Sequence, residues 1–336
     1  MASKKIGKAT VKFTNPPIIA GIGTIVGPME GRGPLARDFD VVLPDMAFGE
    51  KTAERSERKL LEQAAQIAIE RSGIDKDMID YYIAGDLLNQ IISASFSARQ
   101  LAIPFIGVYG ACSTCAMGTA FGGMILDGGF ADYVLVACSS HYQTAERQFR
   151  YPIELNIQHK ATSQYTVTGA GALVLASSGN GPRVTWATTG RVIDLGVKDP
   201  YNLGAAMAPA ACDTLLRHVA DTGFSPDVYD LILTGDLGSL GSELFTELTK
   251  DAGCDVGSNH KDCGLMIFDT KTQRVGSGAS GCACAAVVTF GHVLKEMERG
   301  NLKKILLIAT GALLSPLTFQ QGESIPGVGH AIVIEP

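Results

Sequence analysis

The sequence predicts an α/β protein built from two similar halves. Three observations support this prediction: a segment that recurs along the chain, alternating helix-like and strand-like stretches in each half, and many glycines in a weakly charged chain. The 336 residues include 39 glycines and only 18% charged residues, against about 7% glycine and about 25% charged residues in average soluble proteins. With 46% hydrophobic residues, the chain can bury an extensive core, which excludes intrinsic disorder.

The clearest repeat pairs residues 73–87 with residues 223–237. Six of the fifteen positions are identical. Each copy contains a short polar link, then a run of apolar residues that predicts a buried strand, then a Gly-Asp pair where that strand ends. A helix is expected before each copy, and in the first half the apolar side chains of residues 52–72 recur at helical spacing.

The strand pattern continues to the end of each half. Residues 133–138 and 305–310 predict a further buried strand in the two halves. Residues 171–175 and 330–334 predict a closing strand in the same order. Each half therefore alternates helix and strand, as expected for a mixed sheet with helices on both faces.

A pair of matching turns completes the repeat. Gly110-Ala111-Cys112-Ser113 corresponds to Gly278-Ala279-Ser280-Gly281, and each precedes a stretch of small, uncharged residues. We therefore expect two halves of one architecture, at residues 1–180 and 181–336.

Two long stretches carry no formal charge: residues 101–126, and residues 275–294 when His292 is counted as neutral. Each is long enough to span a membrane, for which about 20 apolar residues suffice. Both, however, contain several glycines together with Ser, Thr and Cys, where a lipid-facing helix would carry Leu and Ile. We therefore expect core helices, because a helix that is apolar all round is also typical of a large protein's interior.

Charge and cysteine content exclude several classes of protein. A net charge of −6 provides no basic field for a phosphate backbone, so nucleic acid is not an expected partner. The N-terminus has lysines but no apolar stretch of signal-peptide length, which favours the cytosol or a cytosol-facing surface. Eight cysteines in a chain of this length do not predict a disulfide framework. Cys112 and Cys115 have the spacing of half a zinc site or of a redox pair, but no second pair follows, so no metal site is expected.

Chemically useful residues follow the predicted strands. Ligands of open α/β sheets bind at the carboxyl ends of strands, and those ends carry Asp86, Cys112, His141 and Asp236. Cys112 precedes a predicted helix, whose amides and dipole would lower the pKa of its thiol. The alternative is that Cys112 is one of several buried, reduced thiols that pack as small apolar groups.

With these residues in view, nearly the whole chain resembles the stage V sporulation protein AD family of spore-forming bacteria, within the thiolase and ketoacyl-synthase superfamily. The duplicated halves and the cysteine at the head of the first central helix are features of that superfamily. The matching segments are AGDLLNQ at residues 84–90, GACST at 110–114, SSH at 139–141, TAERQFRYP at 144–152, MAPAA at 207–211, GCAC at 281–284 and ATGALLSP at 309–316.

The resemblance implies a duplicated thiolase-like fold, a five-layered αβαβα sandwich, and a protein that binds dipicolinic acid for uptake into the developing spore. Dipicolinate accumulates in spores as its calcium chelate, so the ligand is expected either free or with calcium. The resemblance also implies other stage V sporulation A membrane proteins as partners and a homodimer formed around residues 105–109. It implies a cytoplasmic-type soluble protein that associates peripherally with the spore inner membrane, and no cofactor.

The groups that complete the catalytic set of condensing enzymes are missing. These enzymes combine a nucleophilic cysteine with His and Cys, or His and Asn, which shift protons and hold the thioester oxyanion. Here Gly235-Asp236 stands where ketoacyl synthases place a histidine, and Ala309-Thr310 stands near the position of the second thiolase cysteine. We therefore predict a binding protein. The alternatives are a residual acyltransferase with Cys112 as nucleophile and a structural scaffold for membrane partners, which would not bind dipicolinate.

The expected ligand site surrounds Cys112. Dipicolinate is a flat ring with two carboxylates, so backbone amides of residues 112–114 are expected to hold one carboxylate. His141, Arg147 or Arg150 would meet the other carboxylate.

The duplicated acids Asp86 and Asp236 fit two interpretations. They would either contact the calcium of the chelate or cap the turns that follow them, and capping is favoured. The complete set of candidate ligand-binding residues is Asp86, Asn89, Cys112, Ser113, Thr114, His141, Arg147, Arg150, Asp236 and Cys282.

Overall fold

The computed structural model describes residues 4–149 and 160–336, and the first half contains a five-stranded mixed sheet. Its strand order is β5-β4-β6-β8-β2. The parallel pairs are β5 with β4 and β4 with β6, and the antiparallel pairs are β6 with β8 and β8 with β2. The strands are β2 (Ile18–Val26), β4 (Tyr81–Gly85), β5 (Phe105–Gly107), β6 (Tyr133–Ser140) and β8 (Gly169–Ala176).

The second half repeats this sheet strand for strand. Its order is β11-β10-β13-β14-β9, and each neighbouring pair has the same relative direction as its counterpart in the first half. The sequence repeat therefore corresponds to a repeat of topology. The strands are β9 (Arg183–Thr188), β10 (Leu231–Thr234), β11 (His260–Asp262), β13 (Ile305–Ala312) and β14 (Gly327–Glu335).

The two sheets join where Ile18 of β2 pairs with Arg183 of β9, which makes one continuous sheet of 12 strands once β1 and β3 are included. Two short strands flank it, β1 (Thr10–Lys12) beside β9 and β3 (Val41–Val42) beside β2. A separate pair, β7 (Tyr165–Thr166) with β12 (Ala279–Ser280), links the halves near the candidate site.

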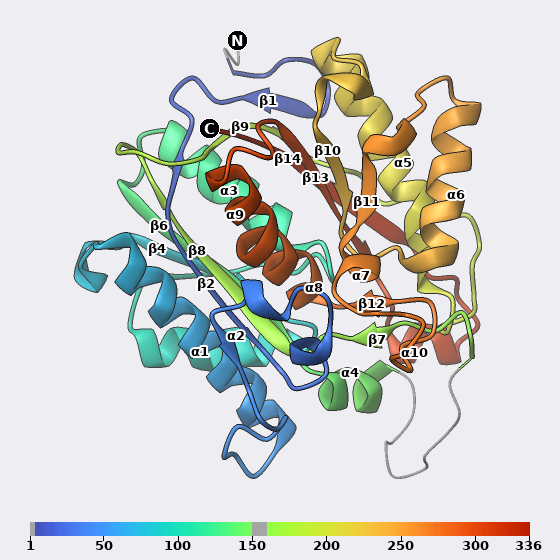
Figure 1. The fold of residues 1–336 in the computed structure, drawn as a ribbon, viewed down its shortest axis with the longest axis horizontal. Helices are drawn as coiled ribbons and strands as arrows, with labels where there is room; N and C mark the ends of the chain where they lie inside the picture. The colour runs from blue at the N-terminus through green and yellow to red at the C-terminus, as the bar shows by residue number, and fades with distance from the viewer. Residues whose placement is uncertain (1–3, 150–159) are drawn as a thin grey trace.

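Helices cover the sheets in the five layers expected (Figure 1). One pair packs on the outer face of the first sheet and one pair on the outer face of the second, while a third pair fills the space between the sheets. The outer helices are α1 (Ala53–Ser72) and α2 (Ile92–Leu101), then α5 (Leu203–Thr222) and α6 (Gly238–Asp251). The central helices are α3 (Thr114–Asp127) and α8 (Cys282–Val287), and α8 continues through a π-helical segment (Val288–Val293) into α9 (Leu294–Glu298). The remaining helices are α4 (Tyr142–Phe149), α7 (Cys263–Met266) and α10 (Pro316–Gln320).

The uncharged stretches lie in this middle layer, as predicted. Helix α3 contacts strands of both sheets, and every residue of α8 is buried. In one respect the expectation was too simple, because residues 101–126 also contain β5 and a sharp turn before α3 begins. Over the described residues, no helix combines the length and the apolar character needed to cross a bilayer.

The glycines that open the two repeat segments have a common conformational role. Gly73 ends α1 with φ of 67°, and Gly223 ends α5 with φ of 73°. Side chains other than glycine rarely adopt this left-handed conformation, so the same residue recurs where each outer helix turns back toward its sheet.

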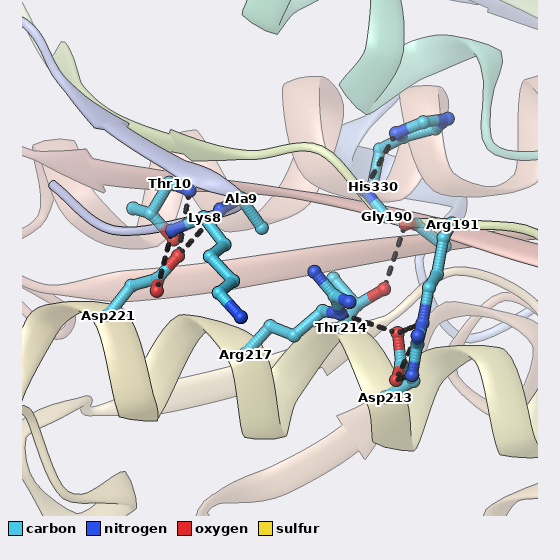
Figure 2. A network of polar contacts seen from close by, with 11 residues as sticks. Lys8, Ala9, Thr10, Gly190, Arg191, Asp213, Thr214, Arg217, Asp221 and His330 are labelled. Atoms are coloured by element: carbon cyan, nitrogen blue, oxygen red, sulfur yellow. Dashed lines mark hydrogen bonds and ion pairs between the residues drawn. The ribbon is translucent and has the colours of Figure 1, made fainter. Parts of the chain in front are cut away.

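The end of α5 anchors the N-terminal segment through one carboxylate (Figure 2). Asp221 accepts hydrogen bonds from the backbone N–H groups of Lys8, Ala9 and Thr10, at 3.0, 2.8 and 2.9 Å. Burial opposes ionisation of this carboxyl, but the amide donors together lower its pKa. The carboxylate thereby holds β1 against β9.

We predict that Asp221→Asn lowers the free energy of unfolding by about 1 kcal/mol at pH 7. The loss is no larger because solvent partly screens this carboxylate. Because the native pKa lies below that of the unfolded chain, the stabilisation is present above the unfolded pKa and is lost as pH falls through the native pKa. Urea unfolding from pH 7 to pH 3 measures this difference. Asp251→Asn, at the exposed end of α6, is the control, and an equal loss in both variants would contradict the assignment.

Candidate functional site

Cys112 lies in a tight turn between β5 and α3. The turn places Ala111 at φ of 48°, a strained conformation for a residue with a side chain and one often found at functional sites. The amides of Ser113 and Thr114 donate to Gly110 O and Ala111 O, at 3.0 and 3.2 Å. Their hydroxyls donate to the same two oxygens, each at 2.6 Å. These donors are occupied within the turn, so at Ser113 and Thr114 the predicted amide cradle for a carboxylate is not formed in this conformation.

The repeat brings Cys112 and Ser280 together, although they are 168 residues apart in the chain. The two residues occupy equivalent positions of the matching turns, and Cys112 Sγ lies 3.7 Å from Ser280 Oγ. Ser280 Oγ donates its proton to Asp236 Oδ2 at 2.8 Å, so the thiol must be the donor to Ser280. The result is a chain of hydrogen bonds from Cys112 through Ser280 to Asp236.

Asp236 forms the end of this chain and is 1% exposed. Its carboxylate also accepts from Thr310 Oγ1 at 2.8 Å and from the amide of Gly281 at 3.1 Å, at the start of α8. Burial raises the pKa of the carboxyl, against the effect of these donors. Its hydrogen-bond partners are thus protein donors but, contrary to the expectation, Asp236 does not cap the turn that follows it. The amides of Leu237 and Gly238 in that turn donate to Asp262 instead, at 2.8 and 3.0 Å.

The environment of Cys112 raises the pKa of its thiol, contrary to the expectation from its place before a helix. Burial makes the largest contribution, and the charge of Asp236 adds to it. The helix dipole is outweighed because the thiolate would be surrounded by apolar groups and would face a carboxylate. Cys112 is therefore a protonated thiol at neutral pH.

The second sheet approaches the Cys112 turn closely at Gly311 on β13. A Cβ atom at this position would lie 2.3 Å from Gly110 O and 3.1 Å from the amide nitrogens of Cys112 and Ser113. Only glycine fits there without moving the backbone, so this contact holds the two halves of the site in register.

A narrow chamber above Cys112 opens toward a larger cleft. The chamber has a volume of about 30 Å³, which is room for a water molecule but not for an aromatic dicarboxylate. The adjoining cleft has a volume of about 410 Å³, and both spaces are bordered by the same four residues, Leu87, Tyr109, Phe149 and Leu314. A small-molecule ligand would therefore occupy the cleft, with Cys112 beneath its inner end.

Asp86 and His141 are held by structural hydrogen bonds. Asp86 accepts from the amides of Leu88 at 2.8 Å and Ala94 at 2.7 Å, which caps the start of α2. His141 accepts from the amide of Gln143 through Nδ1 at 3.2 Å, so its Nε2 donates to Met46 O at 2.9 Å. Burial lowers the pKa of His141, and this residue does not line the chamber around Cys112.

The remaining candidate residues differ in whether they line the cleft. Asn89 lines the cleft, whereas Arg147 forms an exposed ion pair with Glu54 of α1 at 2.8 Å and does not line it. Cys282 is buried and its thiol donates to Ala111 O at 2.9 Å. Arg150 lies outside the described residues.

The cleft contains functional groups that sequence reasoning missed. Tyr109 is 45% exposed as a whole residue, but its hydroxyl group is largely desolvated, which raises the pKa of that group. The hydroxyl is therefore a hydrogen-bond donor at every physiological pH. Gln148 links α4 to the opposite wall, where its amide donates to Leu87 O at 3.1 Å and to Asn89 Oδ1 at 3.2 Å. Ser315 borders the outer part. Gln148 and Ser315 fall within the family-specific motifs, but only the fold shows which side chains of those motifs meet.

We predict that Asp236→Asn speeds alkylation of Cys112 by iodoacetamide at pH 8 at least about threefold, because removal of the facing charge lowers the pKa of the thiol. Peptide mass spectrometry follows Cys112 separately from the other seven cysteines. Asp86→Asn is the matched control, since the equivalent acid of the first half does not contact Cys112. An unchanged rate in Asp236→Asn would contradict the assigned origin of the raised pKa.

Solved structures with the same fold cover almost the whole chain. A 3-oxoacyl-[acyl-carrier-protein] synthase III from Aquifex aeolicus is 14% identical, with a TM-score of 0.58 over 95% of this chain and 100% of that chain. Cerulenin-bound OleA from Xanthomonas campestris is 17% identical, with a TM-score of 0.61 over 97% of this chain and 100% of that chain. At these identities the similarity concerns the fold alone, and it confirms the predicted thiolase-like sandwich.

Sequence comparison reaches a closer relative. Stage V sporulation protein AD of Bacillus subtilis is 46% identical over 332 residues, which is 99% of this chain and 98% of that protein. The sequence model of the same family matches residues 7–335. The chain therefore belongs to the stage V sporulation protein AD family.

Proposed function

We propose that this protein acts in sporulation as a non-catalytic binding protein for dipicolinic acid, free or as its calcium chelate, in uptake into the developing spore. The observation that carries the proposal is the cleft of about 410 Å³, which adjoins the chamber of a protonated, buried thiol. Its volume lies within the range of about 300–1,000 Å³ typical of small-molecule sites. Family membership supports a spore-specific ligand.

The cleft walls suit a flat aromatic ring with two carboxylates. Leu87, Phe149 and Pro316 provide apolar surface for the ring. Tyr109 and Ser315 carry hydroxyl donors that can meet carboxylate oxygens.

The charge of the lining favours the chelate over the free dianion. The described residues that line the cleft include no Lys, Arg, Asp or Glu. Calcium dipicolinate in a one-to-one complex is neutral, so its entry does not require a buried counter-charge, whereas the dianion would pay for desolvation.

The chemistry around Cys112 supports binding rather than turnover. A condensing enzyme needs a thiolate and a base, but here the thiol donates toward Ser280 and faces Asp236. Deprotonation would place two negative charges close together in a dry site. The alternative, a residual acyltransferase, would have to use Asp236 as the base through Ser280.

Calorimetric titration with dipicolinate, with and without calcium, tests the proposal. We expect saturable binding that is tighter with calcium, and Tyr109→Phe should weaken it about three- to tenfold through the loss of one hydrogen bond. Tyr133→Phe is the matched control, because Tyr133 lies at the start of β6 and does not line the cleft. Arg147→Ala and Cys112→Ala should change the affinity less than twofold, which is a free-energy change below about 0.4 kcal/mol.

Two outcomes would contradict the proposal. One is the absence of saturable binding with either form of the ligand. The other is a mass increase on Cys112, with turnover, when the protein is incubated with acyl-CoA, because a thioester at that residue requires the acyltransferase mechanism.

We extend the proposal to a homodimer through β5 and to peripheral association with membrane proteins of the same sporulation system. Strand β5 ends the sheet order, and Phe105 is 36% exposed there. An unpaired edge strand with an exposed aromatic side chain suits a second copy. Family membership is the support for the membrane partners and for a place at the spore inner membrane.

Sedimentation velocity checks the dimer. We expect a concentration-dependent dimer that Phe105→Lys converts to monomer, since a charge would be buried at the edge of β5. Phe130→Lys, at a side chain that is 76% exposed in the loop before β6, should leave the dimer intact. A wild-type protein that stays monomeric at micromolar concentrations would contradict this part of the proposal.

A further inference from the structure

We propose a second ligand site, for a phosphate group, between α1 and α2 on the outer face of the first half. A pocket of about 350 Å³ lies there. The described lining of this pocket shares no residue with that of the cleft near Cys112. The side chains that matter for the proposal are Glu54, Arg55, Arg58, Ser93, Phe96 and Arg99.

The pocket is positively charged in a protein whose net charge is −6. Three guanidinium groups border it, from Arg55, Arg58 and Arg99. Arg58 lies 3.3 Å from Glu62, while neither Arg55 nor Arg99 forms an ion pair with a described residue. Among the described lining residues the one acid is Glu54, which is paired with Arg147 at 2.8 Å. Outside the lining, Glu62 interacts electrostatically with Arg58 and Arg99, so one further carboxylate offsets part of the charge of the three guanidinium groups. The local balance therefore favours an anion.

Phe96 holds two of the guanidinium groups in place. The ring centroid lies 4.5 Å from Arg99 Cζ and 5.9 Å from Arg58 Cζ, so both cations contact the aromatic ring. Contact with a ring leaves the N–H donors at the guanidinium edge available. Less side-chain freedom is then lost when a ligand binds.

Ser93 provides a second and independent indication of a ligand. It is 3% exposed and lines the pocket, yet its hydroxyl has no hydrogen-bond partner among the described residues. Buried hydroxyls are normally paired, so an acceptor from outside the chain would complete this one. The N-terminal amides of α2 do not contribute, because Asp86 already accepts from Ala94 N at 2.7 Å.

The arrangement of donors favours phosphate over carboxylate. A carboxylate has two oxygens in one plane, which one guanidinium group can saturate in a bidentate pair. A phosphate group offers three or more oxygens in a tetrahedral arrangement, so it can accept from several guanidinium groups and from the Ser93 hydroxyl together. Two sources carry this chemistry: a soluble phosphate or phosphate ester, and the headgroup of an anionic phospholipid.

Titration of the full chain with inorganic phosphate and with glycerol 3-phosphate tests the site. We expect saturable binding that Arg99→Ala or Arg55→Ala weakens at least about tenfold and that Ser93→Ala weakens about threefold. Arg99→Lys keeps the charge but loses the fork of donors, so it should also weaken binding. Arg274→Ala removes an exposed arginine of the second half and is the matched control. Thermal unfolding of each variant verifies that the fold is retained.

Co-sedimentation with vesicles distinguishes the two sources. If the phosphate belongs to a lipid, phosphatidylcholine vesicles with added phosphatidylglycerol should bind the wild-type protein but not the Arg99→Ala variant. Binding of glycerol 3-phosphate without retention on vesicles assigns a soluble phosphate ester. Three results would overturn the site: no saturable binding of any of these probes, equal binding by all variants, or displacement of phosphate by dipicolinate in the wild type but not in Tyr109→Phe. In contrast, loss of dipicolinate binding without loss of phosphate binding would overturn only the proposed function of the cleft.

Discussion

The space between the two sheets is so narrow that mainly small, uncharged side chains fill it, and the rest of the structure depends on this constraint. The close contact of Gly311 with Gly110 O marks its limit. The buried residues of α3 and α8 are therefore mostly Gly, Ala, Cys and Thr, with Leu126 and Val287 as larger apolar residues and Asp127 at the end of α3. Helix α3 packs between strands of both halves. Any ionisable group at this depth is desolvated, which accounts for the raised pKa values of Cys112 and Asp236.

Duplication placed equivalent residues at the centre and then allowed them to diverge. Cys112 and Ser280 occupy the same position of the two turns and meet at 3.7 Å. Asp86 and Asp236 follow equivalent strands, but they serve different ends. Asp86 caps the outer helix α2, whereas Asp236 binds Thr310, Ser280 and the start of the central helix α8. The two halves thus share one architecture but contain different polar networks, and of the two only the network of Asp236 reaches the Cys112 thiol.

Helix α4 contributes residues near both proposed ligand sites, the cleft between the halves and the pocket between α1 and α2. Gln148 fixes the wall of the cleft through Asn89, and the neighbouring Arg147 neutralises Glu54 in the arginine-lined pocket between α1 and α2. The sites differ in chemistry: the described cleft lining is uncharged and leads inward to Cys112, whereas the outer pocket exposes guanidinium groups. Their ligands should differ accordingly, a neutral chelate in one and an anion in the other.

Periodicity, repeats and glycine placement in the sequence predicted two similar halves, each with a mixed sheet and helices on both faces, and the family resemblance implied the five-layered arrangement. Residues 73–87 and 223–237 predicted equivalent strands because buried strands and helix-ending glycines leave local patterns that neighbours in the chain share. The sequence also determined the family, through motifs spread over nearly the whole chain.

Only the tertiary structure decided the chemistry of the site. The state of the Cys112 thiol depends on burial and on Asp236, which lies more than a hundred residues away in the chain. The cleft joins Asn89 to Gln148, and the outer pocket joins α1 to α2. Such contacts arise from packing between distant segments, and no local pattern in the sequence records them.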